Sequence, residues 1–226
     1  MIEHAPWRGD EYSLGISGQK IAVVGYSHYG STGEEDTVEK TRGCIRRVIP
    51  GEWKLAFFTQ IRNYFGYDDH GAFWSRLIFF NFLPNFAGDP DNRYMHGTEE
   101  QRALGRDRFV RLIQDEQPEK VFIFTSRHWA FERDKERCQL GPNFPPGFSW
   151  SICQAGNRRA TAFFLRHPQG ASGELMRQAV KYVLEVPSPL EKPALHLAPT
   201  VQHILQLGEN KARKTDVLRI YRLLSR

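Results

Sequence analysis

The stretch RLIFFNFLPNF, residues 76–86, ends a run of large apolar side chains at Asn81. Leu77 to Phe80 have the length and the aromatic or branched character of a strand that is buried on both faces of a parallel sheet. An asparagine amide is costly to bury without hydrogen-bond partners. The stretch therefore predicts a buried strand and marks Asn81, at its carboxyl end, as a candidate functional residue.

Similar apolar runs predict four strands in all: KIAVVGYS (20–27), RLIFFNF (76–82), KVFIFTS (120–126) and ATAFFLRH (160–167). Residues 99–117 and 173–185 repeat apolar side chains every three to four positions, as amphipathic helices do. Pro118 stops the first helix, and Ser172 can cap the second. Strands that alternate with helices predict an α/β fold whose parallel sheet is covered by helices on both faces.

The 226 residues are enough for one sizeable α/β domain with a short appendage. The connector EVPSPLEKPALHLAPT, residues 185–200, is rich in proline and predicts a boundary. We expect an α/β domain over residues 1–190 and a C-terminal basic helical extension over residues 191–226, packed on or next to that domain.

The net charge of +5 resides in the C-terminal tail. Residues 1–210 carry 25 basic and 25 acidic side chains, whereas residues 211–226 carry 6 basic and 1 acidic. Arginine outnumbers lysine, 22 to 9, and a guanidinium fork suits phosphate oxygens. DNA or another nucleic acid is therefore an expected partner, although charge alone is also consistent with a solvated helix face.

The composition predicts neither a cofactor nor a membrane partner. Three cysteines without a Cys-x-x-Cys pair argue against a disulfide framework, a zinc site or an iron–sulfur cluster. No stretch approaches the roughly 20 apolar residues of a membrane helix, and the N-terminus lacks the order of a signal peptide. We expect a soluble cytoplasmic protein with no metal, no cofactor and no obligate protein partner.

The carboxyl ends of the predicted strands gather polar, aromatic and glycine residues: Gly25 to Gly30, Asn81, Ser126 to Trp129, and His167 to Gly170. Ligands of open parallel sheets bind outside these ends, where loops and helix N-termini converge. An amide at this edge could read the edge of a nucleobase. Taken singly, Asn81 and His167 also have structural explanations, as a strand terminator and a packed histidine, and GYSHYG lacks a nucleotide-binding fingerprint.

In their order and spacing, these segments resemble the uracil-DNA glycosylase superfamily over residues 18–185. VVGYSHYG is similar to the first glycine loop of the family, LIFFNF to the strand that ends in asparagine, and FLRHPQGAS to the His-Pro-Ser type of loop. The resemblance implies a three-layer αβα sandwich around a four-stranded parallel sheet. It also implies a DNA glycosylase, an enzyme that extrudes a nucleotide from DNA and hydrolyses the N-glycosidic bond of its base.

The resemblance gives a role to each matching position. His167 would stabilise the departing base, Asn81 would read its edge, and Phe58 would stack on it. The residues expected to line the pocket are Gly25, Tyr26, Ser27, Tyr29 and Gln169. Contacts with DNA are expected from Arg127, Arg166, Ser172, Lys211, Arg213 and Lys214.

The chain departs from the family pattern in its first motif. Tyr26 and Ser27 stand where the family offers Asp, Asn or Glu to position water. Glu35 and Asp36, shortly after the glycine loop, are the candidates for that role. His28 replaces the motif proline and adds a titratable donor, so it also joins the candidate catalytic residues.

These departures, together with Gln169 in place of the family serine, suggest a base other than plain uracil. One hypothesis is antiviral defence, in which the enzyme removes glucosylated hydroxymethylcytosine from phage DNA. The additions Tyr26, His28 and Tyr29 would suit a larger or sugar-bearing base. Tyr29 also opposes this hypothesis, because one branch of the family uses a tyrosine there to exclude a 5-methyl group.

Two other functions fit parts of the pattern. A small-ester hydrolase would use Ser27 as its nucleophile and His167 as the base, but the chain lacks a Gly-x-Ser-x-Gly elbow. A catalytically inactive DNA-binding module would keep the pocket without a residue that activates water, and its affinity would fall steeply with salt.

Overall fold

The computed structural model describes residues 2–30, 33–88, 96–125, 148–155 and 157–185. The chain divides into two compact units, Met1–Leu190 and Glu191–Arg226. All of the second unit lies outside the described residues, so the basic helical extension stays a prediction.

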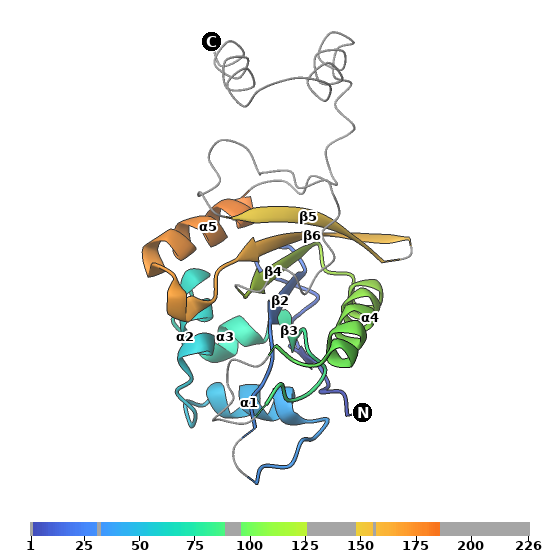
Figure 1. The fold of residues 1–226 in the computed structure, drawn as a ribbon. Helices are drawn as coiled ribbons and strands as arrows, with labels where there is room; N and C mark the ends of the chain where they lie inside the picture. The colour runs from blue at the N-terminus through green and yellow to red at the C-terminus, as the bar shows by residue number, and fades with distance from the viewer. Residues whose placement is uncertain (1, 31–32, 89–95, 126–147, 156, 186–226) are drawn as a thin grey trace, which may run out of the picture. The chain divides into compact units, whose positions relative to one another are not determined.

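A six-stranded mixed sheet forms the centre of the first unit (Figure 1). In the spatial order β1-β3-β2-β4-β6-β5, its strands are β1 (Trp7–Arg8), β3 (Leu77–Asn81), β2 (Ile21–Gly25), β4 (Lys120–Phe124), β6 (Arg158–Leu165) and β5 (Ser149–Ala155). The four strands expected from the sequence are the inner ones, and they run parallel to one another. In their register, Gly25 lies opposite Asn81.

The expectation of a four-stranded parallel sheet is wrong in the number of strands and in their uniform direction. β1 pairs antiparallel with β3, and β5 pairs antiparallel with β6, so both edges of the sheet carry an antiparallel strand. β1 has only 2 residues, too few for a periodic pattern, and β5 (SWSICQA) mixes polar with apolar side chains, as edge strands do. A search for continuous apolar runs therefore misses both strands.

The helices are α1 (Lys40–Val48), α2 (Ala56–Tyr64), α3 (His70–Trp74), α4 (Glu99–Glu116) and α5 (Gly173–Glu185), with a short 3-10 helix η3 (Pro168–Gly170). The two helices expected from the sequence are confirmed as α4 and α5. α4 begins with a capping box, in which Thr98 and Gln101 satisfy each other's backbone N–H groups. It ends at Gln117, which has a left-handed backbone with φ 52°.

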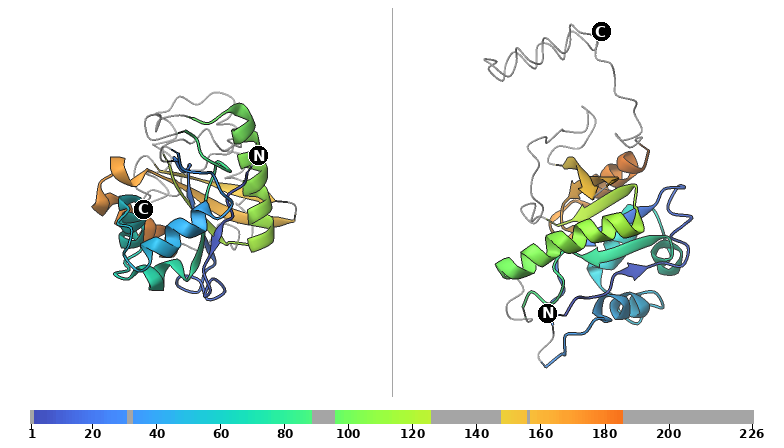
Figure 2. Two further views of the ribbon diagram at one scale, coloured as in Figure 1. Left: turned by 90° about the horizontal axis from the view of Figure 1, so that it is seen from below. Right: turned by 90° about the vertical axis from the view of Figure 1, so that its right-hand side faces the viewer.

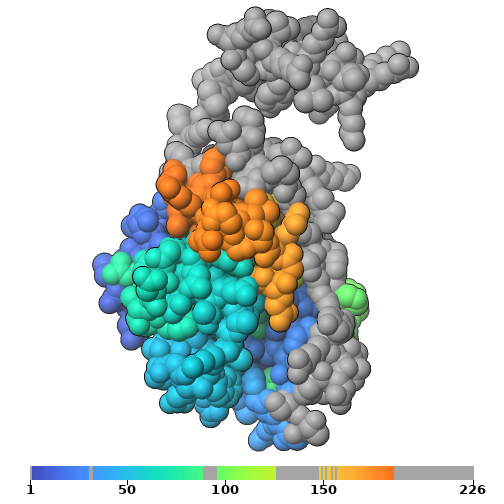
Figure 3. All heavy atoms as spheres, turned by 90° about the vertical axis from the view of Figure 1, so that its left-hand side faces the viewer, coloured from blue at the N-terminus to red at the C-terminus, as the bar shows by residue number. Residues whose placement is uncertain are grey.

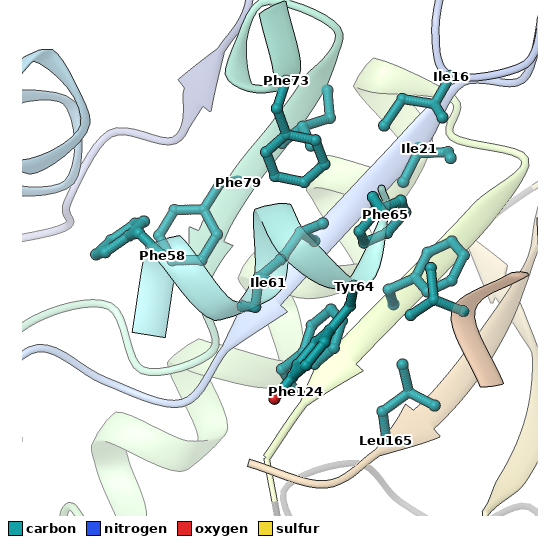
Figure 4. Close-up of a cluster of buried hydrophobic side chains, with 14 of the residues drawn as sticks. Ile16, Ile21, Phe58, Ile61, Tyr64, Phe65, Phe73, Phe79, Phe124 and Leu165 are labelled. Atoms are coloured by element: carbon teal, nitrogen blue, oxygen red, sulfur yellow. The ribbon is translucent and has the colours of Figure 1, made fainter. Parts of the chain in front are cut away.

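Two hydrophobic clusters lie on opposite faces of the sheet. The first joins alternate strand residues such as Phe79 and Leu165 to apolar side chains of α1, α2, α3 and α5. Figure 4 shows the part of this cluster that α2 and α3 form with the strands. The second joins the intervening strand residues, such as Phe80, to α4, which crosses the other face of the sheet (Figure 2). On the molecular surface, α2 and α5 adjoin each other (Figure 3). Among the described helices, none is both long and apolar enough to cross a lipid bilayer.

Candidate functional site

The carboxyl ends of β2, β3 and β6 direct functional side chains to the same face of the sheet. Leu77 and Phe79 belong to the first cluster, so the two-residue alternation of β3 puts Asn81 on that face as well. Gly25 lies beside Asn81 in the register. His167 follows Leu165 by two residues in extended backbone, with φ −61° and ψ 134°. The structure thus brings together three of the predicted positions on the side of the sheet that α2 covers.

Gly25 lets the Asn81 amide lie over the end of β2. A Cβ atom on residue 25 would stand 2.2 Å from Asn81 Oδ1 and 3.3 Å from Phe57 Cζ. Asn81 is 4% exposed, and its side-chain amide makes no hydrogen bond with any described residue. Neither amide atom of Asn81 is among the fully buried polar atoms without a partner, so both remain accessible to a ligand with matching donors and acceptors.

His167 presents a hydrogen-bond donor at the same edge. Its Nδ1 atom accepts a hydrogen bond from the backbone N–H of Gln169 at 3.3 Å. A neutral imidazole whose Nδ1 is an acceptor carries its proton on Nε2, so this bond selects the tautomer that donates from Nε2. The ring lies 5.4 Å from that of Phe57, centroid to centroid.

The aromatic ring at this edge belongs to Phe57, not to Phe58 as the sequence suggested. Phe58 is 5% exposed and packs edge-to-face against Trp74 and Phe79, at 5.3 Å from each ring (Figure 4). Phe57 is partly exposed and lies against Gly25 and His167. Neighbouring residues at the start of a helix point about 100° apart. Both rings are evident in the sequence, but the sequence does not fix where α2 begins, and this decides which ring lies at the edge of the sheet and which lies in the core.

The glycine loop after β2 runs alongside the loop after β3. Four backbone hydrogen bonds join them, from Phe82 N to Gly25 O (2.9 Å), from Leu83 N to Tyr26 O (2.8 Å), from Ala87 N to His28 O (3.1 Å) and from Gly30 N to Gly88 O (3.1 Å). The pairing of β2 with β3 is thereby extended beyond the strand ends, which holds the loop firmly beside Asn81.

The tyrosines of this loop do not face Asn81. Tyr26 is buried in the second cluster and donates to the carbonyl of His96 at 2.5 Å, and Tyr29 packs against the same cluster. Ser27 Oγ is buried and makes no hydrogen bond in the described ranges. The Ser27–His167 bond that an ester hydrolase would need is therefore not formed.

The predicted water-activating residues are engaged elsewhere or exposed. Asp36 Oδ1 accepts from His4 Nε2 at 2.5 Å, and its Oδ2 accepts from the backbone N–H of Phe86 at 3.3 Å. Glu35 is exposed. His4 was missed from the sequence, because no periodicity or motif distinguishes it.

His28 is held as a neutral side chain. Its Nε2 atom lies 3.0 Å from Thr41 Oγ1, and its ring is 5.4 Å from that of His4. Desolvation of the ring, with smaller contributions from the positive charges of neighbouring residues, lowers the pKa of His28 to about 3. His28 is therefore uncharged at neutral pH and cannot supply a positive charge to the site.

The predicted DNA-contacting residues fall into two groups. Arg166 and Ser172 are exposed around η3, as is Gln169, which was expected to line the pocket, and the Arg166 guanidinium lies 5.8 Å from the centre of the Phe148 ring. The others, Arg127, Lys211, Arg213 and Lys214, lie outside the described residues and stay predictions.

In the described part of the chain, no group of three or more His, Cys, Asp or Glu side chains is arranged to hold a metal ion. Comparison with known proteins adds no further assignment: no protein-family model matches the sequence, and no curated protein matches it significantly.

Proposed function

We propose that this chain is a DNA glycosylase with the αβα sandwich of the uracil-DNA glycosylase superfamily, and that it hydrolyses the N-glycosidic bond of a damaged or modified base. The single observation that carries the proposal is the buried Asn81 amide, which lacks a hydrogen bond within the described residues and lies beside Phe57 near the end of β2. Together with His167, it offers what recognition of an extruded base requires, namely an amide reader, a stacking ring and a hydrogen-bond donor.

The chemistry follows from the charge that develops as the bond breaks. The sugar becomes positive and the leaving base negative, so a donor aimed at a base oxygen binds the transition state more strongly than the ground state. His167 Nε2–H would be that donor, held in the right tautomer by the Gln169 N–H. Asn81 would pair with the base edge, and Phe57 would stack on its face. Loss of one such donor typically lowers the rate by about 10²–10³.

For the substrate, we favour a cytosine with a bulky 5-substituent, such as the glucosylated hydroxymethylcytosine of phage DNA. The main objection was Tyr29, as a residue that excludes 5-substituents. Its contacts with the second cluster, on the face of the sheet opposite to Asn81, weaken that objection.

The test is mass spectrometry of the bases that the purified protein releases from DNA containing uracil, hypoxanthine, hydroxymethylcytosine or glucosylated hydroxymethylcytosine. We expect release of one base, slowed by about 10²–10³ but still measurable in Asn81→Ala and in His167→Ala. Asn63→Ala is the matched control, because Asn63 is exposed on α2 and its side chain bonds, among the described residues, only to Arg62. Uracil release alone would overturn the antiviral hypothesis but leave a glycosylase.

A catalytically inactive DNA-binding module is the second candidate. It is favoured by the engagement of both Asp36 carboxylate oxygens and by the absence of a carboxylate from residues 25–30. Salt-sensitive DNA binding without release of any base from the panel would support the module and overturn the glycosylase.

A further inference from the structure

Arg108 of α4 is a buried cation that the proposed chemistry does not use. It is 1% exposed and lies over the Phe80 ring, 5.4 Å from its centre. Burial lowers the pKa of Arg108 to about 10, so it remains charged at neutral pH. A buried guanidinium is stable only where its N–H groups find acceptors.

Through its hydrogen bonds, Arg108 links three segments that are distant in sequence: its own helix α4, the end of β3 and the N-terminal residues. Nη1 donates to the backbone carbonyl of Asn81, and Nη2 donates to the backbone carbonyl of His4. Nε donates to Glu3 Oε1 at 3.2 Å, and the two side chains thereby also form an ion pair. One side chain therefore connects α4 to the end of β3 and to the N-terminal segment.

The N-terminal segment is fixed in turn to the loops around the candidate site. His4 N–H donates to Pro84 O at 2.7 Å, and Ala5 N–H donates to Val38 O at 2.7 Å. The His4 ring binds Asp36, which holds the backbone N–H of Phe86. Because the N-terminal segment is held in this way, Glu3 and His4 fix the position of the Arg108 guanidinium. This sets the direction of its hydrogen bond to the Asn81 carbonyl.

The contact at Asn81 matters because its amide has no hydrogen bond of its own with the described residues. The direction of the side chain then depends on the backbone of residue 81 and on packing. An arginine that donates to the Asn81 carbonyl fixes the orientation of the peptide group between residues 81 and 82. It does so with a planar guanidinium group, which a lysine lacks.

We propose that Arg108, anchored by Glu3, is a positioning residue for Asn81 that keeps the unpaired amide directed at the bound base. This inference rests on the proposed function for its substrate. The positioning itself can be measured without catalysis.

The experiment compares Arg108→Lys and Glu3→Gln with the control Arg106→Lys in the full chain. Arg106 lies on the same helix, and its ion pair in the described part of the chain is with Glu99, at 3.5 Å on the surface. One readout is the side-chain amide signal of Asn81 in a ¹H–¹⁵N NMR spectrum, assigned by its loss in Asn81→Ala. The other is the single-turnover rate of base release, measured in both the wild-type and the Asn81→Ala backgrounds.

We expect Arg108→Lys to shift the Asn81 amide signal and to slow base release by about tenfold or more, as small misplacements of a reacting group do. Glu3→Gln should act in the same direction but less, and Arg106→Lys should change neither readout. In the Asn81→Ala background, Arg108→Lys should cause no further loss, because its effect passes through Asn81.

An unchanged Asn81 signal in a folded Arg108→Lys protein would overturn the proposal, as would losses that multiply in the double variant. If Arg108→Lys does not fold, Glu3→Gln decides, and an unchanged Asn81 signal there overturns the proposal. Absence of base release by the wild-type protein would contradict the proposed function instead, and the NMR readout would still test the positioning.

Discussion

Gly25 illustrates how a missing side chain can form a site. Only a hydrogen atom fits between its Cα atom and the Asn81 amide, because a Cβ atom would stand 2.2 Å from Asn81 Oδ1. The obstacles are side-chain atoms of Asn81 and Phe57 and not backbone. A larger residue at this position would therefore displace the Asn81 amide while leaving the strand pairing in place.

We expect Gly25→Ala to lower base release about as much as Asn81→Ala does, with a loss of about 1–3 kcal/mol in the free energy of unfolding from overpacking. Release assays and urea unfolding measure the two effects separately. The control is Gly43→Ala, because a Cβ atom at residue 43 would meet nothing within 4 Å. Normal release by Gly25→Ala would show that Asn81 does not read the base from its present position.

The neutral His28 makes stability depend on pH. Its pKa is about 3 in the folded protein and about 6.5 in the unfolded chain. Below pH 6.5 the unfolded chain binds a proton that the folded protein does not, so the free energy of unfolding falls as the pH decreases toward 3. The loss from this group is about 2 kcal/mol between neutral pH and pH 5. The lowered pKa values of His4 and His70 act in the same direction.

Replacing His28 with glutamine removes the titrating ring and keeps a polar group that can bond to Thr41. Urea unfolding at several pH values between 7.5 and 4 should therefore give a shallower decline for His28→Gln than for the wild-type protein. If the free energy of unfolding of the two proteins fell equally with pH, His28 would have the same pKa in the folded and the unfolded state.

The helix α4 packs closely against the residue that follows β3. A Cβ atom on Gly105 would lie 2.7 Å from the backbone oxygen of Phe82 and 3.1 Å from two atoms of its ring. Glycine is unfavourable inside a helix by about 1 kcal/mol relative to alanine. Close packing against the residue that follows Asn81 explains why this position nevertheless suits glycine.

Gly105→Ala and Gly43→Ala should therefore change stability in opposite directions. The first should lower the free energy of unfolding by about 1 kcal/mol or more, because the clash with backbone outweighs the better helix propensity. The second, in the open environment of α1, should raise it by about 0.5–1 kcal/mol. Chemical denaturation of both variants gives the comparison, and stabilisation by Gly105→Ala would contradict the close packing of α4.

The sequence predicted the strands and helices whose patterns are long and strongly apolar. The inner strands and the helices α4 and α5 are where their periodicity put them. The edge strands were missed, because β1 has 2 residues and β5 contains no continuous apolar run. The sequence could not tell which of Phe57 and Phe58 lies at the edge of the sheet, since that depends on where α2 begins. The contacts of Arg108 with Glu3 and His4 join residues more than 100 positions apart, which no local pattern encodes.

The excess of basic residues and the candidate site lie in different parts of the chain. The candidate site lies in the first unit, whereas residues 1–210 have no net charge and the excess of basic residues lies in 211–226. The proposed glycosylase would bind DNA of any sequence and then act on one base; on that proposal the basic residues of 211–226 would supply the first task, and Asn81 and His167 the second. Affinity and catalysis should then respond to different substitutions.

A triple variant with Lys211, Arg213 and Lys214 each changed to glutamine tests this division. Each phosphate contact contributes about 0.7–0.9 to the slope of log affinity against log salt. The slope for DNA binding should therefore fall by up to about 2–3, while the rate of base release at saturating DNA stays unchanged. The control replaces Arg8, Arg76 and Lys181 with glutamine and removes the same charge from β1, from the residue before β3 and from α5. Equal slopes for the two variants would mean that the tail contributes only its net charge, and a slower chemical step in the tail variant would mean that the tail acts at the site itself.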